Sequence, residues 1–272
     1  MKEVVKLIDK VVREKKLDAH QGLNCLLDFL IDMFDVRHYL TENGWFEYAA
    51  KAEKEEPHLY KIMLIWMDKV ATAMENGSWL DFFGGIYEEM YQSKGKASTL
   101  GQFFTPPPLC DLMAHICKPV NGMVNDCACG SGRTLLAGAA IHGFPRDNFY
   151  VGEDLDMTSV KMCALNLMIH GCQGRFVQHD TLKNPICFAY GFRINDIRYP
   201  IPTPFYSLTR ISFTKKDMDK ENEKTKARYE ENTRIAIHGN DEIIVPNGKA
   251  KPIFEKKEEL NVAPFTQLSL FD

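Results

Sequence analysis

The chain has 272 residues, 45% of them hydrophobic and 26% charged, which is the composition of an ordinary globular protein of one or two domains. No run reaches the ~20 apolar residues that cross a bilayer, and the first residues, MKEVVKLIDK, do not resemble a signal peptide, so we expect a cytoplasmic protein with no membrane segment. A net charge of −4 disfavours unaided binding to nucleic acid, because phosphate contacts require Lys and Arg concentrated on a local face or supplied by a partner.

Residues 1–98 are predicted to be helical. Apolar side chains recur there at helical spacing: Leu59, Met63, Trp66 and Val70, then Leu80, Phe83, Tyr87 and Met90. Pro57 precedes the first stripe and suits the first turn of a helix. We expect an N-terminal helical bundle, because each stripe must be buried against a neighbour.

Residues 124–140, VNDCACGSGRTLLAGAA, predict a short strand, a glycine loop and a helix that begins at about Arg133. Gly130 and Gly132 flank Ser131 at the turn, where side chains would obstruct a ligand that approaches the backbone. The N–H groups of the new helix carry partial positive charge, so the loop favours an anionic or nucleoside-like ligand. The alternative is a glycine turn that only ends a strand.

Two further strands follow in the chain. NFYVGEDLD (148–156) predicts a second strand, MTSVKMCALNLMIHG a helix that stops at Gly171, and RFVQHD (175–180) a third strand. The strands at 122–127, 149–154 and 175–179 are expected to be parallel neighbours that end in Asp126, Asp154 and Asp180. Such acids line the ligand crevice of an open α/β sheet, and the acid of the second strand commonly binds a ribose. The expected fold class is α/β, with a doubly wound, Rossmann-like domain after the helical bundle.

The periodicity of apolar residues that predicts strands and helices becomes less regular after residue 183. FRINDIRYPIPTPFYSLTRISF predicts one or two strands interrupted by prolines, and residues 215–234 carry the mixed charge of a solvated helix or flexible segment. We therefore divide the chain into a helical domain at 1–98, a ligand-binding domain at 99–212 and a charged C-terminal segment at 213–272. The eight cysteines include no C-x-x-C pair, and Cys127 and Cys129 have poor zinc spacing, so we expect reduced, buried thiols and no metal site.

Five motifs stand in a fixed order: GQFFTPPPLCDLM (101–113), DCACGSG (126–132), GEDLD (152–156), NLMIHG (166–171) and HDTL (179–182). Together they resemble the S-adenosylmethionine-binding half of adenine-N6 DNA methyltransferases, above all the modification subunit of type I restriction systems. The resemblance spans roughly residues 80–182 and implies the S-adenosylmethionine-dependent methyltransferase fold. Residues 1–98 would then be the N-terminal helical domain of such subunits, although a generic bundle fits their pattern equally well.

The resemblance also implies S-adenosyl-L-methionine as cofactor and a set of residues around it. The segment that would close over its methionine end is Gln102, Phe103, Phe104, Thr105 and Pro106; the loop beneath it would be Cys129, Gly130, Ser131 and Gly132. Asp126 would lie near the amino group, Asp154 would hold the ribose and Asp180 the adenine amine. The charges agree, since sulfonium and ammonium groups favour carboxylates. Cys127 and His179 depart from the family, which has proline and glycine there.

The family's catalytic motif, Asn/Asp-Pro-Pro-Tyr/Phe after the fourth strand, is missing. In that motif an amide and a carbonyl accept the hydrogens of the adenine amine, and the aromatic ring stacks on the flipped base. No such tetrapeptide exists in this sequence. The candidates for a degenerate version are NPIC, with Asn184 and Pro185, TPFY, with Pro204 and Phe205, and the acceptor Asn195. A connecting loop is the simpler interpretation of each.

Three classes of function remain open. The chain is an adenine-N6 DNA methyltransferase or a truncated relative of one, a methyltransferase of another acceptor, or an inactive accessory protein that keeps the cofactor-binding fold. The expected partners are DNA and a specificity or restriction subunit.

The C-terminal QLSLF matches the short peptide by which bacterial polymerases and repair proteins dock on the DNA polymerase sliding clamp. Leu268, Leu270 and Phe271 would fill apolar pockets on the clamp, and Gln267 would bond at their rim. The alternative is a terminal segment that packs on the protein's own surface.

Overall fold

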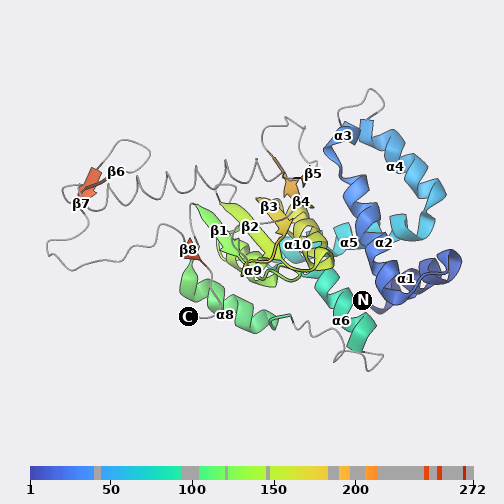
Figure 1. The fold of residues 1–272 in the computed structure, drawn as a ribbon, viewed down its shortest axis with the longest axis horizontal. Coiled ribbons are helices and arrows are strands. Elements are labelled where there is room, and N and C mark those ends of the chain that lie inside the picture. Colours follow the sequence, from blue (N-terminus) through green and yellow to red (C-terminus); the bar gives the residue numbers. More distant parts are fainter. Residues whose placement is uncertain are drawn as a thin grey trace.

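The computed structural model describes residues 1–39, 44–92, 104–119, 122–144, 148–182, 190–196, 206–212, 242–244, 250–252 and 266–267 (Figure 1). The helices are α1 (Lys2–Lys15), α2 (Ala19–Met33), α3 (Val36–Tyr39), α4 (Gly44–Glu55), α5 (Pro57–Glu75), α6 (Phe82–Gln92), α8 (Pro107–Cys117), α9 (Arg133–Ala140) and α10 (Met157–Ile169). The strands are β1 (Met123–Asp126), β2 (Phe149–Asp154), β3 (Gln173–Gln178), β4 (Tyr190–Ile194), β5 (Leu208–Ser212), β6 (Glu242–Ile244), β7 (Ala250–Pro252) and β8 (Thr266–Gln267).

Helices α5 and α6 form where the two apolar stripes predict them, and α1 to α4 lie in the segment predicted to be helical. Helix α2 starts with a capping box, in which Asp18 and Gln21 each accept a hydrogen bond from the other's backbone N–H. Helix α5 begins at Pro57, and its predicted stripe is buried, with Trp66 completely shielded from solvent. The division of the chain into domains at residue 98 stays a prediction.

The main sheet has the strand order β5-β4-β3-β2-β1-β8. Strands β1, β2 and β3 are parallel neighbours, with Asp126 opposite Gly152 and Asp154 opposite Gln178, so this prediction is confirmed. The one or two strands expected after residue 183 are β4 and β5, and both pairings, β4 with β3 and β5 with β4, are antiparallel. Strand β8 pairs parallel with the other side of β1. The sheet is therefore mixed.

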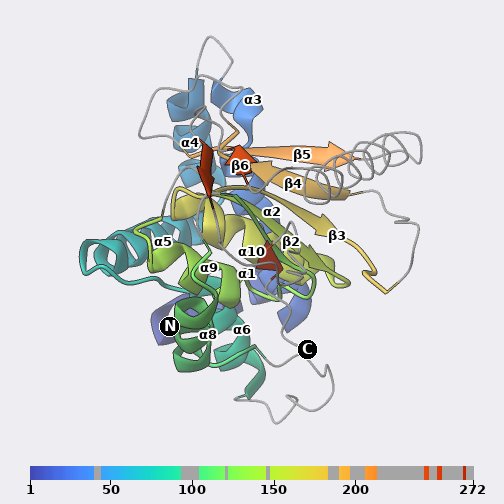
Figure 2. The same ribbon diagram turned by 90° about the vertical axis from the view of Figure 1, so that its left-hand side faces the viewer.

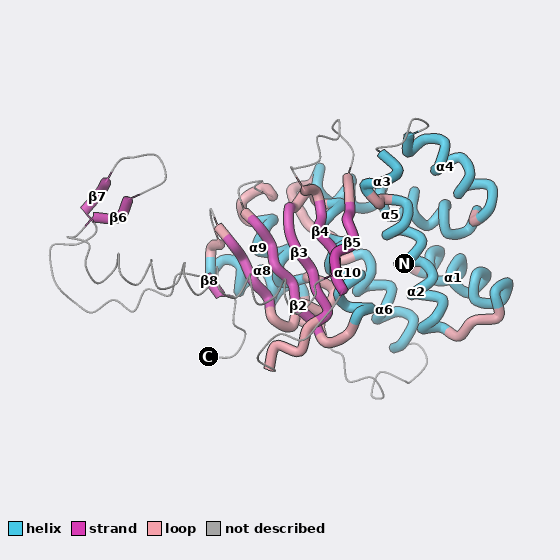
Figure 3. The backbone as a smooth tube through the Cα atoms, turned by 45° about the horizontal axis from the view of Figure 1, so that its top comes forward, coloured by secondary structure: helices cyan, strands magenta, loops and turns pink. Residues whose placement is uncertain are grey.

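Helices α9 and α10 lie on the same face of the sheet (Figures 2 and 3). Both connections, β1–α9–β2 and β2–α10–β3, step in the same direction along the sheet, and right-handed crossovers then place both helices on one side. A doubly wound sheet also carries helices on its second face, and that feature stays a prediction. Helix α10 is buried along most of its length, and a helix buried on all sides carries apolar side chains all round.

One hydrophobic cluster joins the N-terminal helices to the sheet through α10, and it includes Trp66, Phe82, Tyr150 and Phe176. The antiparallel edge is also tied to those helices, because the N–H of Leu208 donates to the Phe34 carbonyl at 2.8 Å. No helix in the described part of the chain is long and apolar enough to cross a membrane. Within the same residues, no group of three His, Cys, Asp or Glu side chains is placed to hold a metal ion.

Candidate functional site

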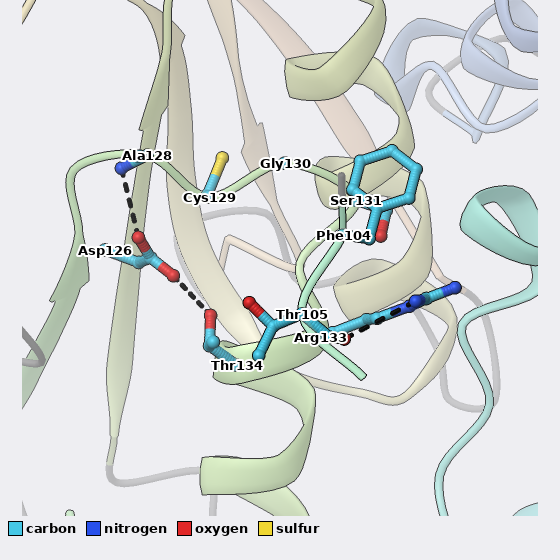
Figure 4. A pocket seen from close by; sticks show the side chains of 9 residues that line it. All are labelled: Phe104, Thr105, Asp126, Ala128, Cys129, Gly130, Ser131, Arg133 and Thr134. Carbon is cyan, nitrogen blue, oxygen red and sulfur yellow. Dashed lines mark hydrogen bonds between the residues drawn. The ribbon is translucent and has the colours of Figure 1, made fainter. Parts of the chain in front are cut away.

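A cleft lies at the carboxyl end of β1, within the region where the sequence predicts the ligand crevice (Figure 4). Its lining residues are Phe104, Thr105, Asp126, Ala128, Cys129, Gly130, Ser131, Arg133 and Thr134. The structure thus brings together the first strand's acid, the glycine loop and the segment before α8, although 22 residues separate Phe104 from Asp126 in the chain.

Backbone hydrogen bonds hold the glycine loop against the second strand. The N–H of Cys129 donates to the Glu153 carbonyl at 2.9 Å, and the N–H of Gly130 donates to Oδ2 of Asp154 at 2.9 Å. Helix α9 then begins at Arg133, as the sequence predicts. The second acid is therefore fixed directly beside the loop.

Gly130 and Gly132 have φ angles of +52° and +92°, in the left-handed region that strains other residues. Both glycines also contact protein atoms closely. A Cβ at position 130 would lie 3.0 Å from the Phe104 ring, and one at position 132 would lie 2.8 Å from Sγ of Cys163 in α10. The sequence pattern explained both glycines by ligand approach, whereas the structure shows that they are needed for packing.

Asp126 lines the cleft, and Asp154 lies beside it, bonded to the glycine loop. Asp126 accepts hydrogen bonds from the N–H of Ala128 at 3.0 Å and from the Thr134 hydroxyl, while Oδ1 of Asp154 accepts the N–H of Asp156 at 2.9 Å. Burial raises the pKa of both carboxyls above the ordinary value, and the charge of Asp154 raises that of Asp126 further. Two desolvated negative charges therefore repel each other, and a cationic ligand would relieve that repulsion.

The third acid lies just beyond β3. Asp180 accepts the N–H of Leu182 at 3.2 Å. His179 is buried, and its Nδ1 lies 3.1 Å from Oε2 of Glu153. Two leucines that follow acids at this edge of the sheet are exposed, Leu155 by 68% and Leu182 by 96%. Neither leucine was among the predicted site residues, although each follows a predicted strand-ending acid by one or two positions.

A buried polar network beneath the loop was also not predicted. Asp81, directly before α6, accepts hydrogen bonds from the Ser131 hydroxyl at 2.6 Å, from Nε of Arg133 at 2.6 Å and from Nδ2 of Asn166 at 2.7 Å. The hydroxyl proton of Ser131 is therefore donated to Asp81. The sequence predicted Asp81 within a helix, whereas it directly precedes α6 as a cap, and its pairing with α9 and α10 depends on the fold.

Asn195, a weak catalytic candidate in the sequence, lies away from the cleft. It follows β4, which runs antiparallel to β3, so it lies at the end of the sheet opposite the cleft. Its Nδ2 donates to the carbonyls of Met168 and Cys172 at 2.8 and 2.9 Å, and its Oδ1 accepts the N–H of Ser207 at 3.1 Å. The amide is used to hold a turn.

Several predicted residues lie outside the described ranges: Gln102 and Phe103, Asn184 and Pro185, Pro204 and Phe205, and Leu268, Leu270 and Phe271. Gln267 lies in β8, where it pairs with Asn125 of β1. That pairing favours the alternative in which the C-terminal segment packs on the protein itself. The clamp-binding peptide stays a prediction.

Comparisons with known proteins identify the family of the chain. The model of the N-6 DNA Methylase family matches residues 79–244. The type I restriction enzyme MpnII methylase subunit of Mycoplasma pneumoniae is 35% identical over 100 residues, which cover 34% of this chain and 18% of that subunit. The HindI methylase subunit of Haemophilus influenzae is 31% identical over 109 residues, 37% of this chain and 24% of that subunit.

A third relative is the type I restriction enzyme MjaIX methylase subunit of Methanocaldococcus jannaschii, 30% identical over 104 residues that cover 35% of this chain and 18% of that subunit. The matches thus span between 18% and 24% of these curated relatives. The family model covers the loop, the acids and the strands that carry them. The chain belongs to the N-6 DNA methylase family and is similar to the methylase subunits of type I restriction enzymes.

Proposed function

We propose that this chain binds S-adenosyl-L-methionine in the cleft at the carboxyl end of β1, as the cofactor-binding part of an adenine-N6 DNA methyltransferase. The observation that carries the proposal is the convergence of Asp126, the glycine loop and the Phe104–Thr105 segment on one cleft, with Asp154 hydrogen-bonded to that loop. Membership in the family implies S-adenosyl-L-methionine as the methyl donor. When bound, this group supplies an electrophilic methyl on a cationic sulfur.

The residues present fit this cofactor. Its sulfonium and ammonium groups would offset the charge of two carboxylates that burial disfavours, Asp126 and Asp154. Oδ2 of Asp154 accepts the N–H of Gly130 and Oδ1 that of Asp156, and a carboxylate has about four lone-pair sites to offer. Asp154 can thus accept both hydroxyls of a ribose without losing its place beside the loop.

The ligand would then lie along the edge of the sheet. Its amino-acid end would sit beneath Phe104 and beside Asp126, and its ribose at Asp154. The adenine would reach the end of β3, where Leu155 and Leu182 offer exposed apolar surface to a flat ring and Asp180 an acceptor for the amine.

Methyl transfer to adenine N6 also needs acceptors for the hydrogens of the amine, which the family takes from a tetrapeptide that this sequence lacks. The main proposal is therefore an enzyme whose acceptor groups come from outside the motif's usual pattern or from a partner. The missing tetrapeptide favours a second candidate, an accessory protein that binds the cofactor without transferring its methyl group. A methyltransferase of another acceptor remains the third.

A transfer assay separates these candidates. Tritium transfer from labelled S-adenosyl-L-methionine to unmethylated duplex DNA is measured for the wild-type protein, for Asp154→Ala and for the exposed control Asp68→Ala. Transfer that Asp154→Ala abolishes and Asp68→Ala preserves supports the DNA methyltransferase. Cofactor binding with no transfer, even with a type I specificity subunit added, supports the accessory protein, and transfer to RNA alone supports another acceptor.

We further propose that the chain acts in the cytoplasm with DNA and a type I specificity or restriction subunit, because similar proteins are methylase subunits of type I enzymes. QLSLF suggests the sliding clamp as a further partner, and tethering would raise the effective concentration of this acidic protein at DNA. Fluorescence anisotropy of the last twelve residues against a bacterial clamp tests this. Loss of binding in Leu270→Ala and Phe271→Ala is expected, and no binding by the wild-type peptide would end the proposal.

A further inference from the structure

A buried polar network joins the N-terminal helices to the glycine loop. Asp81 caps α6, where its Oδ1 accepts the N–H of Gly84 at 2.8 Å, and its side chain is 3% exposed. The same carboxylate accepts from Ser131, Arg133 and Asn166, and Asn166 also donates to the Ser131 carbonyl at 2.9 Å. Both the side chain and the backbone of Ser131 are thus fixed by residues outside the loop.

Arg133 extends this network to the segment that covers the loop. Its Nη1 and Nη2 donate to Oε1 and Oε2 of Glu88, each at 2.8 Å. Nη1 also donates to the Thr105 carbonyl at 3.4 Å, and the guanidinium carbon lies 5.3 Å from the centre of the Phe104 ring. Phe104 in turn lies against Gly130. One guanidinium therefore connects α6, the covering segment and the loop.

Placing Arg133 at this position costs free energy, and a contribution to stability alone does not explain why an arginine stands there. Arg133 is the first residue of α9, where the positive end of the helix dipole disfavours a cation. Its side chain is 8% exposed, so desolvation adds to the penalty, and the carboxylates of Asp81 and Glu88 are needed to offset both. Because packed apolar residues often stabilise as well as a buried ion pair, the geometry that a planar, bidentate arginine imposes is the better explanation.

We propose that Asp81 and Glu88 are positioning residues for the cofactor site. Through Arg133, they hold Phe104 and Thr105 over the glycine loop in the orientation that contacts the amino-acid end of the ligand. The inference rests on the proposed function, since it takes S-adenosyl-L-methionine as that ligand. It gives helix α6 a role in ligand affinity in addition to its role in the core.

The network acts on one end of the ligand. Asp154, at the ribose, is held by the backbone N–H groups of Gly130 and Asp156, whereas Arg133 holds the covering segment at the other end of the cleft. Weakening the contact of Glu88 with Arg133 should therefore lower the affinity for a ligand that has the amino-acid end. It should leave the affinity for a ligand that lacks this end nearly unchanged. If Glu88 had a purely structural role, its loss would lower the affinities for both ligands alike.

The test compares Glu88→Gln with Glu89→Gln in the full chain. Both glutamates are half-buried in α6, and each substitution removes one negative charge. Glu88→Gln leaves Arg133 paired with Asp81, so the fold is expected to survive. Titration calorimetry measures S-adenosylhomocysteine, which has the amino-acid end, and adenosine, which lacks it. Hydrogen–deuterium exchange of residues 104–117 and 127–140 without ligand shows whether the segment and loop are held.

We expect Glu88→Gln to weaken S-adenosylhomocysteine by about tenfold and adenosine by less than about twofold, with faster exchange in both segments, and Glu89→Gln to change neither affinity. Equal losses for the two ligands, or an unchanged affinity for S-adenosylhomocysteine, would overturn the inference and leave the proposed function standing. Failure of the wild-type protein to bind S-adenosylhomocysteine would refute the proposed function, and the positioning role with it.

Discussion

Replacing Gly132 by alanine tests how the glycine loop is seated. Gly132 ends the loop and directly precedes α9, with a φ angle of +92°. A Cβ there would lie 2.8 Å from Sγ of Cys163, 2.9 Å from Cδ1 of Leu167 and 3.3 Å from Cα of Cys163. The Cα of Cys163 is backbone in a buried helix, so rotating side chains would not make enough room.

Two costs add up in Gly132→Ala. A non-glycine residue in the left-handed region costs about 1–2 kcal/mol, and forcing a methyl group into a filled core costs about 1–3 kcal/mol. The expected loss is therefore about 2–5 kcal/mol, a large part of the ~5–15 kcal/mol by which a domain is stable. Gly143→Ala is the matched control, because its φ is +67° and nothing lies within 4 Å of the added Cβ. It should lose about 1–2 kcal/mol.

Urea unfolding followed by circular dichroism measures both free energies of unfolding. If the slopes against urea are equal, the midpoints give the difference directly. We expect Gly132→Ala to be less stable than Gly143→Ala by the packing cost. Equal losses would refute the packing of the loop on α10, and with it the placement of the cleft.

Two further predictions concern buried acids. Asp35→Asn should cost about 2 kcal/mol in urea at neutral pH, because Asp35 accepts from Arg37 and Arg210, the latter 44% exposed. Burial opposes ionisation of Asp35, but the hydrogen bonds and charges of the two arginines hold its pKa below the ordinary value. The stability that the ionised carboxylate contributes should therefore be lost as pH falls below about 4. A loss of stability in Asp35→Asn that persists in acid would contradict the account. Burial raises the pKa of Asp126 and Asp154, so their ionisation destabilises the free protein above that pKa and protonation relieves the penalty as pH falls through it. Cationic S-adenosyl-L-methionine needs the ionised forms, so calorimetry should find weaker binding at pH 5 than at pH 7.5, and affinity that rises toward acid would contradict the assignment.

The sequence predicted the parts of the fold that depend on local pattern. Apolar runs ending in Asp126 and Asp154 located the parallel strands, and glycine followed by Arg133 located the start of α9. For Asn195 the sequence offered a catalytic role beside the simpler connecting loop, and the structure shows a turn. An amide among loop residues suits catalysis and a turn equally well, and its φ of +47° and its contacts with the preceding helix end exist only once β4 has folded back antiparallel.

The network around Arg133 was beyond sequence reasoning because its pairs are distant in the chain. Asp81 and Glu88 stand 52 and 45 residues before the arginine that they hold. Hydrophobic periodicity placed both in a helix without indicating what lay opposite. The turn at the two glycines could be predicted, because a turn is a local property. The neighbours that require glycine there, Phe104 and Cys163, come from other elements and could not be predicted.

The most direct test of the central claim is titration calorimetry of S-adenosylhomocysteine into the 272-residue chain. The cleft predicts saturable one-to-one binding, weakened at least about tenfold by Asp154→Ala, which removes the acceptor proposed for the ribose, and unchanged by the exposed control Asp68→Ala. No binding heat from the wild-type protein at millimolar ligand, or equal affinity in Asp154→Ala, would contradict the claim that this cleft holds the cofactor.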